Sequence, residues 1–223
     1  VQPSIGIFTN IGEAHAAGFL NDTHKAREKF TLFPEVDLFI YCADYPEINQ
    51  ALADYLNIEK SNDEEDNQPM EVFDWSMQSN REARMQVSLL ERKDGEASLK
   101  FREKEQSFEL TFPFMDRASI ENAIHCVALL RAWDYSPEVI QARLNRLNRV
   151  AMRLELRDAI HNCQLINDSY NSDINSLRIA LDFQQQQQQH DRKTVILSDI
   201  LESGRSDIDL YQEVAHLIKE HEV

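Results

Sequence analysis

Residues 5–11 read IGIFTNI and residues 37–42 read DLFIYC, and these two apolar runs decide the fold class. Each run is short, continuous and rich in β-branched or aromatic residues, which is typical of a strand buried on both faces of a sheet. Helical sequence follows each run, at residues 23–32 and at residues 46–56. Strands that alternate with helices predict a parallel sheet with helical crossovers. We therefore expect an α/β protein.

Beyond the acidic, polar loop at residues 59–68, the pattern changes to short alternating runs. Such runs, with Asp94-Gly95 as a turn between two of them, are typical of antiparallel hairpins. Two stretches with apolar residues at helical spacing follow, at residues 117–133 and 137–147. The alternating runs lie at residues 71–75, 83–91, 97–102 and 107–112.

A second α/β unit is expected after about Arg149. Asp173 can cap a helix that runs to Phe183, and the glutamines at residues 184–189 can prolong it, because Gln is a fair helix former. Ser206 with Asp209 has the spacing that opens a last helix. Strands are predicted at residues 154–156, 163–167 and 194–198.

Composition limits the partners and the location. The 223 residues exceed the commonest domain size, which favours two domains. With 23 basic and 39 acidic residues the formal net charge is −16, so we expect neither nucleic acid nor an anionic membrane as a partner. No apolar run approaches the length of a membrane span and no secretory leader is expected, which favours a cytoplasmic location. The three cysteines, Cys42, Cys126 and Cys163, lie in apolar stretches and are expected to be buried, reduced thiols.

His15 and Lys29, fourteen residues apart, could share a site. His15 ends the segment NIGEAH, which follows the first strand and so lies at the edge where parallel sheets bind ligands. A histidine is a good metal ligand, whereas a lysine amine contributes to Mg²⁺ binding only when it is neutral or converted by CO₂ into a carbamate. A polar turn is the alternative interpretation of NIGEAH.

Two further segments carry polar residues at predicted strand ends. Arg153 precedes one strand, and Asp168 follows the next. An aspartate there can accept hydrogen bonds from ribose hydroxyls, and an arginine can bind phosphate as a forked donor. Asp199, in LSDILESG, follows a third predicted strand, where a helix-capping loop is the alternative.

The order of these motifs resembles the Mur ligase family. NIG-x-AH is followed by a lysine, a helix with ENA, RLE, NDSYN with Ser176 beyond it, and SDILESG. The residues of these motifs are most similar to those of the branch that adds D-alanyl-D-alanine to UDP-N-acetylmuramoyl-tripeptide. PSIGIFTNIGEAH and LINDSYNSDINSL are similar to a form fused to an alanine racemase. The resemblance spans nearly the whole chain, apart from about residues 57–110.

The resemblance implies a domain organisation. Residues 1–149 would be the later part of the central ATP-binding domain, a parallel sheet with an antiparallel hairpin region. Residues 150–223 would open a Rossmann-like C-terminal domain. The family's phosphate loop and a metal-binding glutamate would precede Val1, so we expect the chain by itself to be inactive.

The resemblance also assigns roles to single residues. His15 matches a metal-binding histidine and Lys29 a carbamylated lysine. The family usually has His-Asn where this chain has Ala118-Ser119, which puts part of the adenine contact in doubt. The other matches are Asn122 to an asparagine against the adenine, Arg153 to an arginine near the phosphates, Asp168 to an aspartate on the ribose, and Tyr170, Asn171 and Ser176 to the loop that faces the incoming amino component.

The implied reaction is an ATP-dependent ligation in peptidoglycan synthesis. The tripeptide carboxylate attacks the γ-phosphate of ATP to give an acyl phosphate, and the amine of D-alanyl-D-alanine then displaces phosphate. ATP and Mg²⁺ are the expected cofactors, with pyridoxal phosphate only if a fused racemase follows. Two alternatives stay open: a ligase like folylpolyglutamate synthetase, and a non-catalytic binding or scaffold segment.

Overall fold

The chain forms two compact units. One comprises residues 1–11 and 20–147, and the other comprises residues 12–19 and 148–223. The computed structural model describes residues 3–12, 18–33, 35–61, 70–79, 82–93, 95–147, 154–169, 172–187, 192–201 and 203–223.

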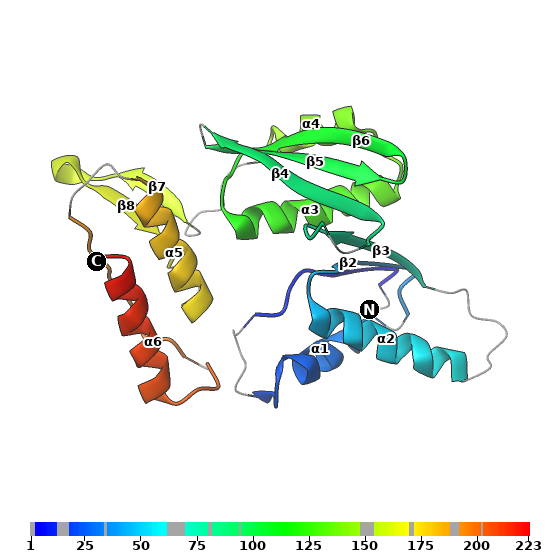
Figure 1. The fold of residues 1–223 in the computed structure, drawn as a ribbon, viewed down its shortest axis with the longest axis horizontal. Helices are drawn as coiled ribbons and strands as arrows, with labels where there is room; N and C mark the ends of the chain where they lie inside the picture. Colours follow the sequence, from blue (N-terminus) through cyan, green and yellow to red (C-terminus); the bar gives the residue numbers. More distant parts are fainter. Residues whose placement is uncertain are drawn as a thin grey trace. The chain divides into compact units, whose positions relative to one another are not determined.

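The first unit is built on a six-stranded mixed sheet (Figure 1). Its first four strands pair in parallel, and the last three form an antiparallel meander. This is the α/β architecture with a hairpin region that the sequence predicts. In order across the sheet the strands are β1 (Ile5–Phe8), β2 (Leu38–Cys42), β3 (Glu71–Ser76), β4 (Met85–Lys93), β5 (Glu96–Glu103) and β6 (Gln106–Phe112).

The predicted direction of β3 is wrong. Residues 71–75 were expected in an antiparallel hairpin, but β3 pairs in parallel with both β2 and β4. Alternating hydrophobicity indicates which face of a strand is buried, and it carries no information about the direction of the neighbouring strand. Only the hairpins β4–β5 and β5–β6 are antiparallel as predicted.

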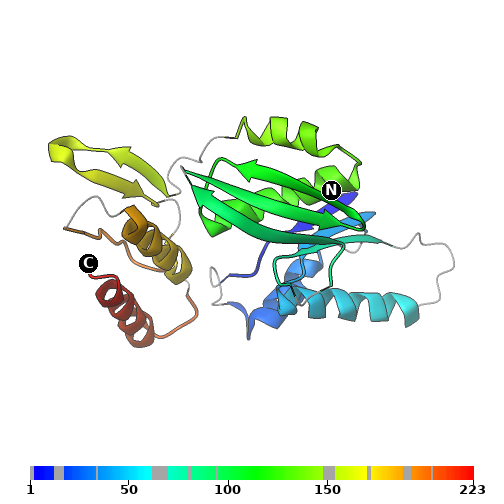
Figure 2. The same ribbon diagram turned by 45° about the horizontal axis from the view of Figure 1, so that its top comes forward.

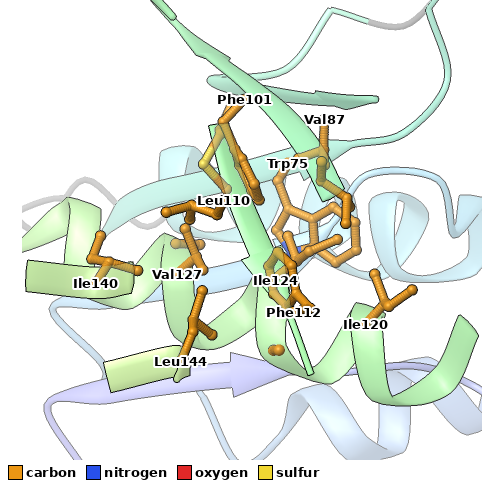
Figure 3. Packing of buried hydrophobic residues seen from close by; sticks show 14 of the residues in the cluster. Trp75, Val87, Phe101, Leu110, Phe112, Ile120, Ile124, Val127, Ile140 and Leu144 are labelled. Carbon is orange, nitrogen blue, oxygen red and sulfur yellow. The ribbon is translucent and has the colours of Figure 1, made fainter. Parts of the chain in front are cut away.

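Helices cover the parallel strands on both faces (Figure 2). On one face α1 (Asp22–Phe30) and α2 (Pro46–Ser61) pack against Phe39 and Tyr41 of β2. On the other, α3 (Arg117–Ala132) packs on β2 and β3 and α4 (Pro137–Leu144) packs on β6, and both helices contribute side chains to the cluster drawn in Figure 3, where Trp75 lies beside Ile124. All five residues of β2 are buried, which explains why its sequence is an uninterrupted apolar run.

The second unit contains a hairpin and two helices. β7 (Glu155–Asp158) and β8 (Gln164–Asn167) pair antiparallel, and the short 3-10 turn Ile160–Asn162 lies between them. α5 (Ile174–Gln187) and α6 (Asp207–Glu220) share a core with Ile200. Both predicted caps are confirmed: the Asp173 carboxylate accepts from the backbone N–H of Ser176, and the Ser206 hydroxyl accepts from the N–H of Asp209.

The strands expected at residues 154–156 and 163–167 are confirmed as β7 and β8, which pair as an antiparallel hairpin because the connection between them is too short for a helical crossover. One prediction for this unit is wrong. Residues 194–198 were expected as a buried strand. None of the described residues pairs with them in a sheet, and Ile196 is 95% exposed, because only alternate side chains, such as Val195 and Leu197, reach the core of α5 and α6.

The predictions for the cysteines and for membrane-spanning helices are compared with the structure last. All three cysteines are free, as expected, and Cys42 is buried in β2. Cys126 and Cys163 are exposed, which corrects their predicted burial: Cys126 lies on the outer side of α3, and Cys163 lies in the turn between β7 and β8. Within the described ranges, no helix combines the length and the apolar character that a membrane crossing requires.

Candidate active site

The carboxyl ends of β1, β2 and β3 lie along one edge of the sheet. Phe8 pairs with Tyr41, and Cys42 pairs with Trp75, so these parallel strands end nearly level with one another. Two side chains of α3 reach this edge and bond to residues that follow the strands. Because α/β folds bind ligands at the carboxyl ends of their strands, this edge is the candidate active site.

Glu121 and Tyr45 form a hydrogen-bonded pair at this edge. The Tyr45 hydroxyl donates to Glu121 Oε1 at 2.5 Å, and Arg117 Nε lies 3.9 Å from Glu121 Oε2. Burial raises the pKa of the Glu121 carboxyl, although the Tyr45 hydrogen bond opposes this shift. Burial, and after it the bond to Glu121, also raises the pKa of Tyr45, which therefore stays protonated and donates.

Asp44 follows β2 and bonds to the last residue of β3 and to the residue after it. Its carboxylate accepts from the Ser76 hydroxyl at 2.5 Å and from the Met77 backbone N–H at 2.9 Å. Beside it, burial raises the pKa of the Cys42 thiol to about 12. A thiol with so little thiolate at neutral pH is a packing residue and not a nucleophile.

His125 links α3 to the carboxyl ends of β1 and β3. The Trp75 indole Nε1–H donates to His125 Nδ1 at 3.1 Å, and His125 Nε2 lies 3.0 Å from the carbonyl oxygen of Thr9. The imidazole is 1% exposed, and burial lowers its pKa to about 4. The ring is therefore neutral at physiological pH.

The predicted site residues of the first unit lie on two helices. Lys29 is exposed in the last turn of α1, whereas Lys25, one turn earlier, is buried. Asn122 is exposed on α3, next to Glu121. Because α1 and α3 pack on opposite faces of the sheet, the backbones of Lys29 and Asn122 lie on opposite sides of it. His15 lies outside the described residues.

Two predicted site residues of the second unit are described. Asp168 Oδ1 accepts from the backbone N–H of Leu154 at 3.0 Å, and Leu154 has a positive φ of 47°. Ser176 donates its backbone N–H to Asp173 and accepts the Asp173 N–H with its hydroxyl, so it completes the cap of α5. Arg153, Tyr170 and Asn171 lie outside the described residues.

The described side chains do not by themselves form a metal centre. No group of three or more His, Cys, Asp or Glu residues that could hold a metal occurs among them. An unmodified lysine amine such as that of Lys29 has no affinity for Mg²⁺. Asp199, the other polar residue singled out at a predicted strand end, accepts a hydrogen bond from the Tyr211 hydroxyl at 3.3 Å, as a residue of a loop against α6.

The residues that build this edge were not among the predicted site residues: Tyr45, Asp44, Glu121 and His125. Tyr45 and Asp44 carry a usable signal, because they directly follow a predicted buried strand. Glu121 and His125 lie on the apolar side of α3, where polar residues need buried partners. Their presence in an otherwise apolar helical stripe was the available signal.

Comparison with known proteins defines the class. Residues 1–130 match the Mur ligase middle domain. The chain belongs to this family. It is 23% identical over 222 residues to the UDP-N-acetylmuramoyl-tripeptide--D-alanyl-D-alanine ligase of Bacillus subtilis, an alignment that covers 97% of the chain and 44% of the relative.

Solved structures share the fold. A crystal structure of MurF from Acinetobacter baumannii superposes with a TM-score of 0.73 and 21% identity, covering 99% of this chain and 44% of that one. The MurF ligase from Thermotoga maritima, solved in complex with ADP, gives 0.70 and 12% identity, with coverage of 97% and 46%. The chain therefore spans less than half the length of each of these relatives.

Proposed function

We propose that this chain is part of an ATP-dependent ligase that adds D-alanyl-D-alanine to UDP-N-acetylmuramoyl-tripeptide in peptidoglycan synthesis. The observation that carries the proposal is the alignment with the Bacillus subtilis ligase, which extends over 97% of the chain and thus across both units. A solved folylpolyglutamate synthetase shares the fold over 82% of the chain with a TM-score of 0.59, less than the MurF structure with 99% and 0.73, so that alternative is not favoured.

The proposed domains differ from the two compact units in one stretch, because residues 12–19 group with residues 148–223. Residues 1–149 are assigned to the later part of the ATP-binding domain and residues 150–223 to the opening part of the C-terminal domain. Such an enzyme draws ATP and nucleotide-linked precursors from the cytoplasm, which is the proposed location. An alanine racemase fused beyond this chain stays a prediction that the parent sequence tests.

The chemistry demands that two anions meet. A carboxylate attacks the γ-phosphate of ATP and displaces ADP, and the amine of D-alanyl-D-alanine then attacks the acyl phosphate, which forms the amide and releases phosphate and a proton. Mg²⁺, when bound, supplies neutralisation of this charge. We assign His15 and a carbamate of Lys29 to hold it. The exposure of the Lys29 side chain leaves its amine accessible to CO₂.

The remaining assignments divide between nucleotide and amino substrate. Asn122 would lie against the adenine, Arg153 near the phosphates and Asp168 at the ribose. The positions of Asn122, exposed beside the carboxyl edge, and of Asp168, directly after β8, support these roles. Tyr170, Asn171 and Ser176 are assigned to the incoming amino component, and for Ser176 this adds to its capping bonds.

Substitution of Lys29 in the full-length parent tests the proposal. Ligation of UDP-N-acetylmuramoyl-tripeptide with D-alanyl-D-alanine is followed by phosphate release and by product mass. Lys29→Arg keeps the positive charge, but a guanidinium stays protonated and does not form a carbamate. We expect both Lys29→Ala and Lys29→Arg to lose at least about 100-fold in kcat, the scale of a lost electrostatic contact in a transition state. Lys100→Ala, an exposed lysine on β5, is the matched control and should keep wild-type activity.

Each outcome separates the competing assignments. Wild-type activity in Lys29→Arg, with or without bicarbonate, would exclude the carbamate. A wild-type parent that binds these substrates without releasing phosphate would favour the scaffold alternative. Turnover with folate and glutamate in place of the muramoyl substrate would favour the folylpolyglutamate synthetase alternative.

A further inference from the structure

One buried histidine of the first unit has a partner at both ring nitrogens and is not used by the proposed chemistry. His125 is buried within the apolar side of α3, beside Ile124 and Trp75, which Figure 3 shows in the same cluster. The Trp75 and His125 rings meet edge to face, with centroids 5.0 Å apart. Both ring nitrogens have a partner, as a buried polar group requires, and these partners come from the end of β3 and from the residue that follows β1.

The two partners fix one state of the ring. An indole N–H can only donate, so Nδ1 of His125 must be an acceptor. A backbone carbonyl can only accept, so Nε2 must carry the proton that points to Thr9. Both bonds exist together only in the neutral Nε2–H tautomer. The burial that keeps the ring neutral is therefore part of the same arrangement.

The last acceptor in this chain of hydrogen bonds is the backbone carbonyl oxygen of Thr9, at the end of β1. Thr9 directly follows β1, and the next residues, Asn10 to Gly12, lead to the segment that carries His15. Thr9 contributes through its backbone carbonyl, so the restraint acts on the path of the main chain whatever its side chain does. Trp75 belongs to β3, which makes the restraint a link across the sheet edge from β3 through α3 to β1.

We propose that His125 is a positioning residue of the ligase. It fixes the main chain at Thr9, directly after the carboxyl end of β1, through the Trp75–His125–Thr9 chain of hydrogen bonds, and ligation depends on that restraint. The inference rests on the proposed function, and it adds to it a residue that acts through the backbone and touches no substrate.

Three substitutions in the full-length parent separate positioning from packing. His125→Gln keeps a donor and an acceptor at similar reach, so it can bond to both Thr9 and Trp75. His125→Leu keeps much of the volume but removes both bonds, and Trp75→Phe removes the donor to Nδ1 together with part of a buried ring. Val127→Ala is the matched control, because Val127 is fully buried on the same helix and its side chain can make no hydrogen bond.

Ligation kinetics, measured per folded molecule below the unfolding temperature, give the first readout. We expect His125→Leu to lower kcat about 100-fold, the cost of a misplacement of roughly 1 Å, with an unchanged KM for D-alanyl-D-alanine. His125→Gln should stay within about threefold of wild type, and Trp75→Phe should fall between them. A loss in His125→Leu no larger than that in Val127→Ala would overturn the proposal. Should His125→Leu fail to fold, equal activity of Trp75→Phe and wild type would overturn it.

A spectroscopic readout makes failure of this inference distinguishable from failure of the proposed function. The indole N–H resonance of Trp75 is assigned as the one missing from Trp75→Phe in a ¹⁵N correlation spectrum. Adding ATP with Mg²⁺ should shift this resonance in wild type and in His125→Gln, and leave it in place in His125→Leu. An unshifted resonance in a parent that ligates would overturn the positioning role. A shifted resonance in a parent without ligase activity would support positioning and reject the proposed reaction.

Discussion

Arg131 and Glu103 form a buried ion pair that we expect to be the most sensitive charged contact of the first unit. Arg131 Nε lies 2.9 Å from Glu103 Oε2, and the two side chains are only 12% and 8% exposed. The guanidinium also donates to the Tyr135 carbonyl oxygen at 2.9 Å and lies 5.4 Å from the centroid of the Phe108 ring. Arg131 thus joins the end of α3 to the β5–β6 hairpin.

The magnitude follows from what remains after one partner is removed. Arg131→Met keeps the apolar stem but leaves the Glu103 carboxylate buried without its counter-ion, which costs about 3–5 kcal/mol. For a unit of this size, each kcal/mol shifts the melting temperature by about 2–4 °C. The expected decrease is therefore about 6–20 °C. Removing both charges, in Arg131→Met with Glu103→Leu, should restore most of the loss, because a buried ion pair is often replaced by apolar residues at little cost.

Calorimetry of the wild-type chain and the variants measures these shifts. Arg102→Met is the control, because Arg102 is the exposed neighbour of Glu103 on β5 and should shift the melting temperature by less than about 2 °C. A double variant as unstable as Arg131→Met alone would refute the reasoning, since the loss would then come from packing and not from an unpaired charge. A single variant as stable as wild type would refute it equally.

Two further predictions concern backbone approach and pH. Gly6→Ala should destabilise the first unit by about 1–3 kcal/mol, because a Cβ on Gly6 would lie 2.5 Å from the Phe33 ring. Urea unfolding of Gly6→Ala measures this loss, and an unchanged midpoint would contradict it. The hydrogen bond to Asp182, and after it the bond to the Leu217 carbonyl, raises the pKa of His221, so its contribution to stability is complete below the unfolded pKa of about 6.5 and is lost as pH rises through the raised folded value. Melting of the second unit should thus fall above pH 6.5 in wild type and less steeply in His221→Gln, with the exposed His216→Gln as control; the same slope in both variants would count against the idea.

The elements themselves were largely predictable from the sequence. Helical spacing and buried runs report on a residue's own neighbourhood, and they located α1, α3, α5 and α6 and the strands β1 to β8 to within a few residues. Their pairing was less predictable. The direction of β3 and the hairpin of β7 with β8 depend on which segment lies alongside, and residues 194–198, predicted as a strand, pair in a sheet with none of the residues that the structure describes.

The buried polar contacts were not predictable. Glu103 continues the inward-facing series Ala97, Leu99 and Phe101 of β5, where alternation alone predicts another apolar residue. It is tolerated because Arg131, distant in sequence, reaches it. His125 in the apolar stripe of α3 is explained in the same way by Trp75 of β3 and by Thr9, which follows β1.

By itself the sequence determined the class of this protein. Its α/β alternation, its capped helices and the ordered motifs from NIGEAH to SDILESG depend on local spacing, which a linear pattern records directly. Only the tertiary structure decided how the carboxyl edge is held. The pairs Tyr45–Glu121 and Thr9–His125 join residues far apart in the chain, and a buried polar group is stable only where folding brings its partner within hydrogen-bond distance.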